Sequence, residues 1–206
     1  WVSVEIPLTA FTGVDLTDVI QLKLDGDGTV WLDNLYFSTA GGGGPSGELA
    51  VNGDFETGTL DGWTTFDNGG SITVVTPGEG GAGSAGNLNV TIPGNPTLKQ
   101  ANVGVGQVTA GQQVTVTFDW KGSAANGGVI DVVLFSELGA GGVSQTDQIL
   151  DGGAAFPADW TTVGPLDITV GPDVSGGITL QITAICGGAA GCLSDVFIDN
   201  VSITVP

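Results

Sequence analysis

The sequence predicts an all-β protein folded as an antiparallel β-sandwich. Glycine accounts for 37 of the 206 residues, and Val, Ile, Thr and Ser dominate the remainder. That composition suits strands joined by turns and leaves little material for helices. Several stretches alternate apolar and polar residues, which is the period of a half-buried strand. Glycine-rich clusters separate these stretches, and short strands spaced by such turns are typical of a sandwich.

Three stretches show the alternation over their whole length: 112–122, 127–137 and 176–185. Because side chains two apart in a strand point to the same face, each stretch is predicted to bury one face and expose the other. The residues expected to face outward are Thr115, Thr117, Asp119 and Lys121 in the first stretch, Asp131, Val133, Phe135 and Glu137 in the second, and Thr179, Gln181 and Thr183 in the third.

The chain is predicted to hold one complete module and part of another. The segment 41–47 (GGGGPSG) has the composition of a flexible linker, and residues 48–206 are long enough for a complete sandwich. The motif WLDNL at 31–35 is matched by FIDNV at 197–201, near the end of that module. Residues 1–40 are therefore predicted to be the C-terminal part of a similar sandwich that precedes the linker.

Residues 1–40 provide too little chain for a sandwich of their own. A segment of this length forms about three strands, too few to bury both faces of a sheet. The strands that complete this part are expected either upstream in the native protein or in a neighbouring copy of the chain.

The charge balance excludes several functions. Three lysines, no arginine and 22 acidic residues give a net charge of −19. Nucleic-acid binding and adhesion to anionic lipid both need more positive charge than this. Histidine is absent, which excludes Ser-His-Asp and Cys-His catalysis and histidine-based zinc sites. No apolar run is long enough to insert into a membrane. Neutral polymers and divalent cations remain as plausible partners.

The two cysteines predict a small disulfide loop. Cys186 and Cys192 flank five small, flexible residues, and two cysteines without histidine make a poor metal site. A disulfide indicates an oxidising compartment, so the protein is expected to be secreted, extracellular or exposed at a cell surface.

Four motifs of the second module form a characteristic set: NGDFETG…GW at 52–63, GSAGNL at 83–88, AGQQVTVTF at 110–118 and FIDNV at 197–201. This pattern resembles the carbohydrate-binding modules of families 4 and 9. The resemblance implies a jelly-roll fold over 48–206, a non-catalytic glycan-binding role, and a structural calcium ion that bridges the two ends of the module.

The resemblance also implies the calcium ligands. Glu56 and Asp199 would give side-chain oxygens, Asp54 would give its backbone carbonyl, and Glu79 would add a carboxylate from the central loop. Carboxylate and carbonyl oxygens are the ligands that calcium prefers. Solvated turn acids are the alternative interpretation of the same residues.

In the family that the sequence resembles, glycan usually lies in a groove across one sheet. Trp63 and Trp120 are assigned to the core, so few aromatic residues remain for sugar contacts. The residues expected to line the groove are the polar side chains of Gln100, Asn102, Asp119, Lys121, Asp131 and Gln181, with Phe135 as the single aromatic residue.

The favoured function is a non-catalytic extracellular module that binds neutral, β-glucan-like polysaccharide within a tandem array of a larger secreted or surface protein. The alternative is a structural repeat of an extracellular filament, adhesin or surface layer, joined to neighbouring copies by strand complementation. Glycoside hydrolysis, which uses a pair of carboxylates, is the third hypothesis, because Asp119, Asp131 and Glu137 could share one face of a sheet. No catalytic motif supports it.

Overall fold

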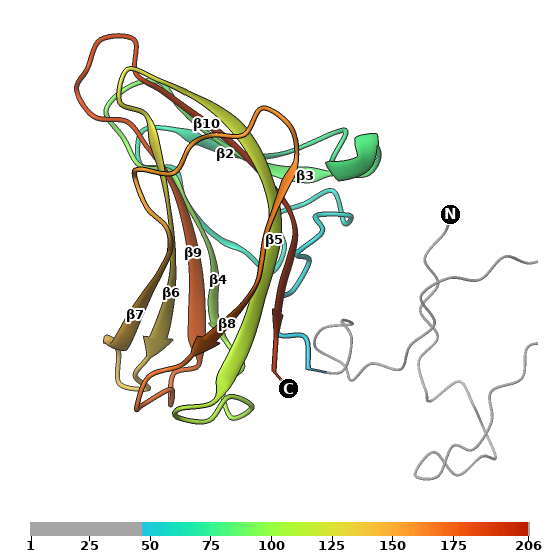
Figure 1. Cartoon of the computed structure of the whole chain (residues 1–206), viewed down its shortest axis with the longest axis vertical. Helices are drawn as coiled ribbons and strands as arrows, with labels where there is room; N and C mark the ends of the chain where they lie inside the picture. The colour runs from blue at the N-terminus through green and yellow to red at the C-terminus, as the bar shows by residue number, and fades with distance from the viewer. Residues whose placement is uncertain (1–46, 206) are drawn as a thin grey trace, which may run out of the picture. The chain divides into compact units, whose positions relative to one another are not determined.

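The structure, a computed structural model, describes residues 47–205 as a sandwich of two five-stranded sheets (Figure 1). Every strand pair is antiparallel. The predicted antiparallel sandwich is therefore confirmed. The predictions for residues 1–40 and for 41–46 of the linker lie outside the described residues. Within residues 47–205, no helix is long and apolar enough to cross a membrane.

The sheets are named here after their central strands. The β10 sheet consists, in spatial order, of β2 (Ser71–Val75), β3 (Ala85–Val90), β10 (Leu193–Thr204), β5 (Gln113–Ala125) and β8 (Thr161–Thr169). The β9 sheet consists of β1 (Thr64–Phe66), β4 (Thr97–Val103), β9 (Ile178–Ile185), β6 (Val129–Glu137) and β7 (Val143–Leu150).

The core lies between the two sheets and is built from the faces that alternation predicts. Trp120 is 4% exposed and makes an edge-to-face contact with Phe156, while Trp63 is 8% exposed and stacks on Phe55. Both tryptophans therefore belong to the core, as expected. The fully buried apolar side chains of the three predicted strands are Val114, Val116 and Phe118 in β5, Ile130, Val132 and Leu134 in β6, and Ile178, Leu180, Ile182 and Ala184 in β9.

The two ends of the described chain are tied to each other. The backbone N–H of Leu49 donates to the carbonyl of Ile203 at 2.7 Å, and that of Val205 donates to Gly47 at 2.9 Å. The carboxylate of Glu48 accepts a further bond from the Ile203 backbone N–H at 2.8 Å. The entering segment thus completes the end of β10 with backbone hydrogen bonds.

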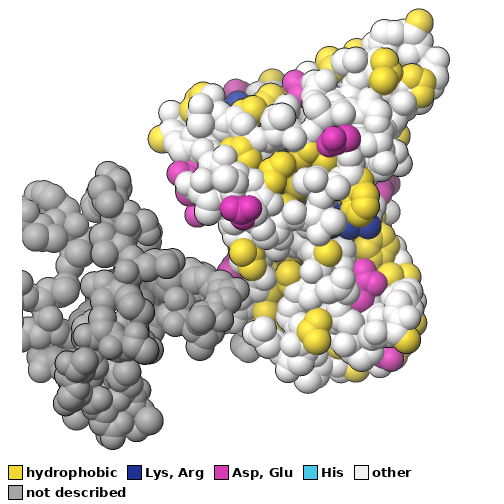
Figure 2. Space-filling model, turned by 180° about the vertical axis from the view of Figure 1, so that it is seen from behind, with side chains coloured by type: hydrophobic (Ala, Val, Ile, Leu, Met, Phe, Trp, Pro, Cys, Tyr) yellow, Lys and Arg dark blue, Asp and Glu magenta, His cyan; other side chains and the backbone are white. Residues whose placement is uncertain are grey.

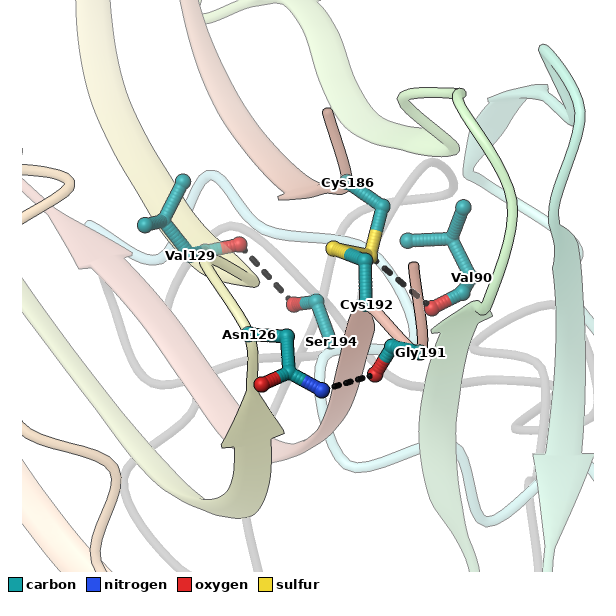
Figure 3. Close-up of a disulfide and its surroundings, with 7 residues drawn as sticks. All are labelled: Val90, Asn126, Val129, Cys186, Gly191, Cys192 and Ser194. Atoms are coloured by element: carbon teal, nitrogen blue, oxygen red, sulfur yellow. Dashed lines mark hydrogen bonds between the residues drawn. A yellow bond between two sulfur atoms is a disulfide. The ribbon is translucent and has the colours of Figure 1, made fainter. Parts of the chain in front are cut away.

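The predicted disulfide joins the two sheets. Cys186 directly follows β9 and Cys192 directly precedes β10, and their Cα atoms are 5.8 Å apart (Figure 3). Asn126, in the turn after β5, donates its side-chain amide to the carbonyl of Gly191 at 3.0 Å, next to Cys192. The bridge therefore closes the connection between the central strands of the two sheets.

Replacing both Cys186 and Cys192 by serine is expected to lower the free energy of unfolding by about 2 kcal/mol, because the bridge closes a short loop in the unfolded chain. Denaturant unfolding under oxidising conditions measures this. The matched control is Ala189→Ser, an exposed position in the same loop. An oxidised wild type no more stable than the double variant would contradict the expectation.

Candidate functional site

A groove of about 420 Å³ lies on the outer face of the β9 sheet. Strand register places its floor: Thr97 on β4 is opposite Thr183 on β9, which is opposite Asp131 on β6. Lys99 is likewise opposite Gln181. The residues that line the groove are Phe66, Asn68, Asn95, Thr97, Lys99, Asp131, Gln181, Thr183 and Ile185.

One aromatic side chain stands at the edge of this groove. Phe66, at the end of β1, is 45% exposed, and cross-strand pairing with Thr97 holds it beside the polar floor. The Lys99 ammonium lies 5.5 Å from the centre of the Phe66 ring. On the other side, the Asp131 carboxylate accepts a hydrogen bond from the Gln148 amide at 2.7 Å.

The groove combines the groups that recognise a hydroxyl-rich, uncharged ligand. A partly exposed ring offers an apolar platform. Amides, hydroxyls, one ammonium and one carboxylate supply both donors and acceptors. Acidic side chains are spread over the face of the module shown in Figure 2, where basic ones are few, so a polyanion would be repelled.

The groove includes two of the residues predicted to bind ligand, Asp131 and Gln181. Phe135 faces outward on the same strand as Asp131 but is not part of the groove lining. Asn102 is exposed at an irregularity of β4, and its side-chain amide donates to the carbonyl of Gly176 at 2.8 Å. Neither Phe135 nor Asn102 shares the groove with the other two.

The expectation that Gln100 faces outward is wrong. Its side chain is fully buried, accepts a hydrogen bond from the Val51 backbone N–H at 3.2 Å and donates to the Val51 carbonyl at 2.6 Å. Leu98, two positions earlier on β4, is also fully buried. Alternation from Leu98 therefore places Gln100 inward and Lys99 outward.

The expectation that Asp119 and Lys121 share one groove with Asp131 is also wrong. Both face outward as predicted, but β5 belongs to the β10 sheet, so they lie on the opposite side of the sandwich. Asp119 accepts a hydrogen bond there from the Asn200 amide at 2.9 Å. Alternation distinguishes inside from outside but does not tell which sheet a strand joins.

Two of the predicted calcium ligands, Glu56 and Asp199, contact the loop between β2 and β3, while the Asp54 carboxylate accepts a hydrogen bond from the Glu56 backbone N–H at 3.3 Å. Glu56 accepts a hydrogen bond from the Ser84 backbone N–H at 2.7 Å, and Asp199 accepts one from the Glu79 backbone N–H, also at 2.7 Å. A residue from each end of the module therefore binds the same loop. Glu79 contributes its backbone, while its side chain is exposed.

Asp199 is a buried carboxylate in an acidic setting. The residue is only 4% exposed. Burial raises the pKa of its carboxyl group to about 6, the backbone N–H groups of Glu79 and Asn200 oppose this shift, and the negative charges of Glu56 and Asp54 add to it. The ionised form of Asp199 is thus disfavoured in the absence of a counter-charge.

Glu56 and Asp199 provide oxygen ligands of the kind a hard cation prefers, but they are only two carboxylates. Within residues 47–205, no group of three acidic or cysteine side chains is close enough to hold a metal ion. Backbone oxygens would have to complete the ligand set, as calcium allows. At Gly78 an added Cβ would lie 2.5 Å from the Ser84 carbonyl oxygen and 2.6 Å from an Asp199 carboxylate oxygen. A carbonyl and a carboxylate oxygen therefore both lie close to Gly78, where the chain has no side chain.

Comparison with known proteins gives one family. A family model described as a carbohydrate binding domain matches residues 47–177. No curated protein matches the chain.

Several solved structures share the fold. The enzymatically active domain of tailspike protein 4 from bacteriophage CBA120 superposes with a TM-score of 0.52 and 15% identity over 77% of this chain, which spans 21% of that domain. The CBM22-1 xylan-binding domain from Paenibacillus barcinonensis Xyn10C gives 0.52 and 16% over 79% of this chain and 97% of that chain. TmCBM61 in complex with β-1,4-galactotriose gives 0.50 and 20%, with coverages of 77% and 99%.

Proposed function

This chain belongs to the carbohydrate binding domain family, and from that premise we propose that residues 48–206 form a non-catalytic module that binds a neutral, β-glucan-like polysaccharide in the groove of the β9 sheet. The groove itself is the observation that carries the proposal, since it sets Phe66 beside a polar floor of Lys99, Asp131 and Gln181.

Charge and composition support a binding role. A single carboxylate, that of Asp131, lines the groove, whereas glycoside hydrolysis generally uses a pair of acidic residues. The net charge of −19 favours an uncharged ligand over an acidic one. Two similar structures are described as a xylan-binding domain and as a galactotriose complex, so neutral glycans of more than one kind belong in the test panel.

The proposed setting is extracellular. The disulfide between Cys186 and Cys192 is of the kind that persists in oxidising compartments. The repeated motif at 31–35 and 197–201 supports a tandem array of related modules within a larger secreted or surface protein. The same repeat favours the second candidate, a structural repeat module of a filament, adhesin or surface layer.

We further propose a structural calcium ion held by Glu56 and Asp199 together with backbone oxygens of the loop between β2 and β3. Bound there, the ion would supply the positive charge that the buried Asp199 lacks. Hydrogen bonds within the chain support this proposal. The carboxylates of Asp199 and Glu56 already accept hydrogen bonds from the loop between β2 and β3, through the backbone N–H groups of Glu79 and Ser84.

Replacing Phe66 by alanine is expected to weaken polysaccharide binding about tenfold or more, because the aromatic platform is lost while the polar floor stays. Affinity electrophoresis in gels that contain laminarin, xylan or hydroxyethylcellulose measures the effect.

Gln181→Ala is expected to weaken binding to a similar degree through loss of a floor amide. The matched controls are Ile92→Ala and Gln107→Ala, both exposed and outside the groove lining.

Wild-type protein that migrates unretarded in all three gels, with calcium present, would contradict glycan binding. If such protein also forms concentration-dependent assemblies in sedimentation, the structural repeat is the better account. Retardation that Phe66→Ala and Gln181→Ala leave unchanged would place the binding site elsewhere on the module.

A further inference from the structure

A second set of ligand-type residues lies on the outer face of the β10 sheet, on the side of the sandwich opposite the groove. The ammonium of Lys121 on β5 lies 4.8 Å from the centre of the Trp160 ring and 5.5 Å from that of Phe197. Phe197 on β10 is directly opposite Lys121 in register, and Trp160 immediately precedes β8 on the other side of β5. One lysine is thus held between two aromatic rings.

Polar side chains on β3 and β10 lie next to these aromatic rings. Asn87 on β3 is opposite Phe197, and Asn89 is opposite Asp195. The side-chain amides of Asn87 and Asn89 both donate to one carboxylate oxygen of Asp195, each at 2.9 Å. Since both bonds end on the same oxygen, the second Asp195 oxygen is left to accept from a ligand, as are the two amide oxygens.

We propose that this surface, called here the β10-face site and formed by Trp160, Lys121, Phe197, Asn87, Asn89 and Asp195, is a second contact surface for a neutral glycan chain. It shares no residue with the groove. The site is therefore independent of the groove and stands even if the groove binds nothing.

The chemistry of the β10-face site fits a glycan better than other partners. Trp160 and Phe197 are partly exposed, whereas Trp63 and Trp120 are buried. Two rings on either side of an ammonium, with two amides and a carboxylate next to Phe197, offer both apolar contact and directed hydrogen bonds, which hydroxyl-rich sugar rings require. The aromatic residues stand on either side of β5, two strand spacings or roughly 10 Å apart. This separation allows one extended chain to cross both.

A second copy of this protein is a less favourable occupant. Each copy carries a net charge of −19, so the approach of two such faces is opposed by repulsion, while a neutral glycan meets none. Nucleic acid is disfavoured for the same reason. A module with glycan sites on both outer faces could bridge two polysaccharide chains, which raises its avidity for a fibrous or insoluble substrate.

The experiment follows the indole N–H signal of Trp160 by two-dimensional nitrogen-15 NMR while laminarin, xylan or hydroxyethylcellulose is added to the full chain. Absence of the signal in Trp160→Phe identifies it. We expect the signal to shift with at least one of these polysaccharides in wild type, and equally in the Phe66→Ala variant. In that variant, Lys121→Gln is expected to weaken the remaining binding about tenfold, with Thr117→Ala, on the same strand face, as the control.

Two results would overturn the proposal. One is a Trp160 indole signal that no polysaccharide moves. The other is a dimer in sedimentation that Trp160→Ala or Lys121→Gln dissociates, since the surface would then be an interface between copies. A Trp160 signal that moves while Phe66→Ala has no effect on binding supports the β10-face site and contradicts the groove, so the failures of the two proposals are distinguishable.

Discussion

Replacing Gln100 by leucine is expected to lower the free energy of unfolding by about 2–4 kcal/mol and to leave glycan binding by the folded protein unchanged. The leucine fills a similar volume but can neither accept from the Val51 backbone N–H nor donate to its carbonyl. Both groups would then lack their partner beside a side chain that is fully buried in the wild type. The loss also frees the entering segment from β4.

Denaturant unfolding measures the first effect, and affinity electrophoresis at a temperature well below the unfolding transition measures the second. Gln107→Leu is the control, because it adds the same apolar side chain at an exposed position. A stable Gln100→Leu variant that has lost polysaccharide binding would restore Gln100 to the ligand-binding residues and contradict its role as a link to Val51.

The strand faces of this fold could be predicted from the sequence because they depend on neighbouring residues. In β5, Val116 and Phe118 are buried and Thr117 faces the other way, as a period of two requires. The disulfide was equally local, since Cys186 and Cys192 are separated by a short flexible segment. Each of these predictions needs only a few consecutive residues.

The choice of sheet could not be predicted in this way. β5 pairs with β10 and β8, whereas β6, the next strand along the chain, pairs with β9 and β7. This pairing joins residues far apart in the sequence, and no periodic pattern reports it. Asp119 and Asp131 consequently lie on opposite faces of the sandwich although both face outward.

The aromatic residue of the groove was missed for a related reason. Phe66 ends a strand of three residues, Thr64–Phe66, which is too short to show alternation. It reaches the groove through its pairing with Thr97 on β4. Lys99 could have been identified, because it alternates with Leu98, a clear core residue.

The metal-free protein is expected to become less stable between pH 4 and pH 6 because of Asp199. Burial raises the pKa of its carboxyl group to about 6 in the folded state, against 3.8 as the ordinary value. The folded state therefore holds this proton more tightly than the unfolded chain does, and stability falls as the pH rises through that window. The contribution is fully present below pH 3.8, is lost above pH 6, and amounts to about 1–3 kcal/mol.

The measurement is the free energy of unfolding in EDTA from pH 4 to pH 8, taken as the difference between wild type and Asp199→Asn. The difference isolates Asp199 from the other acidic residues. Asparagine keeps an acceptor for the Glu79 backbone N–H but cannot ionise. The free energy of unfolding of Asp199→Asn is expected to rise relative to that of the wild type as the pH rises, and a difference that does not change with pH would contradict the expectation.

At pH 7, calcium is expected to make the wild type more stable than Asp199→Asn. An ion present at 100 times its dissociation constant adds about 2.7 kcal/mol to the free energy of unfolding of the wild type. The gain should shrink below pH 6, where protons compete for Asp199, and should be largely lost in Asp199→Asn. Equal gains in the wild type and in Asp199→Asn would remove Asp199 from the proposed ligands, and an equal gain of the wild type in magnesium would contradict a site selective for calcium. The two lysines that the structure describes, Lys99 and Lys121, lie over aromatic rings. A gain in stability of the wild type that only calcium produces would therefore identify the ion as the positive charge that makes the almost fully buried Asp199 carboxylate tolerable.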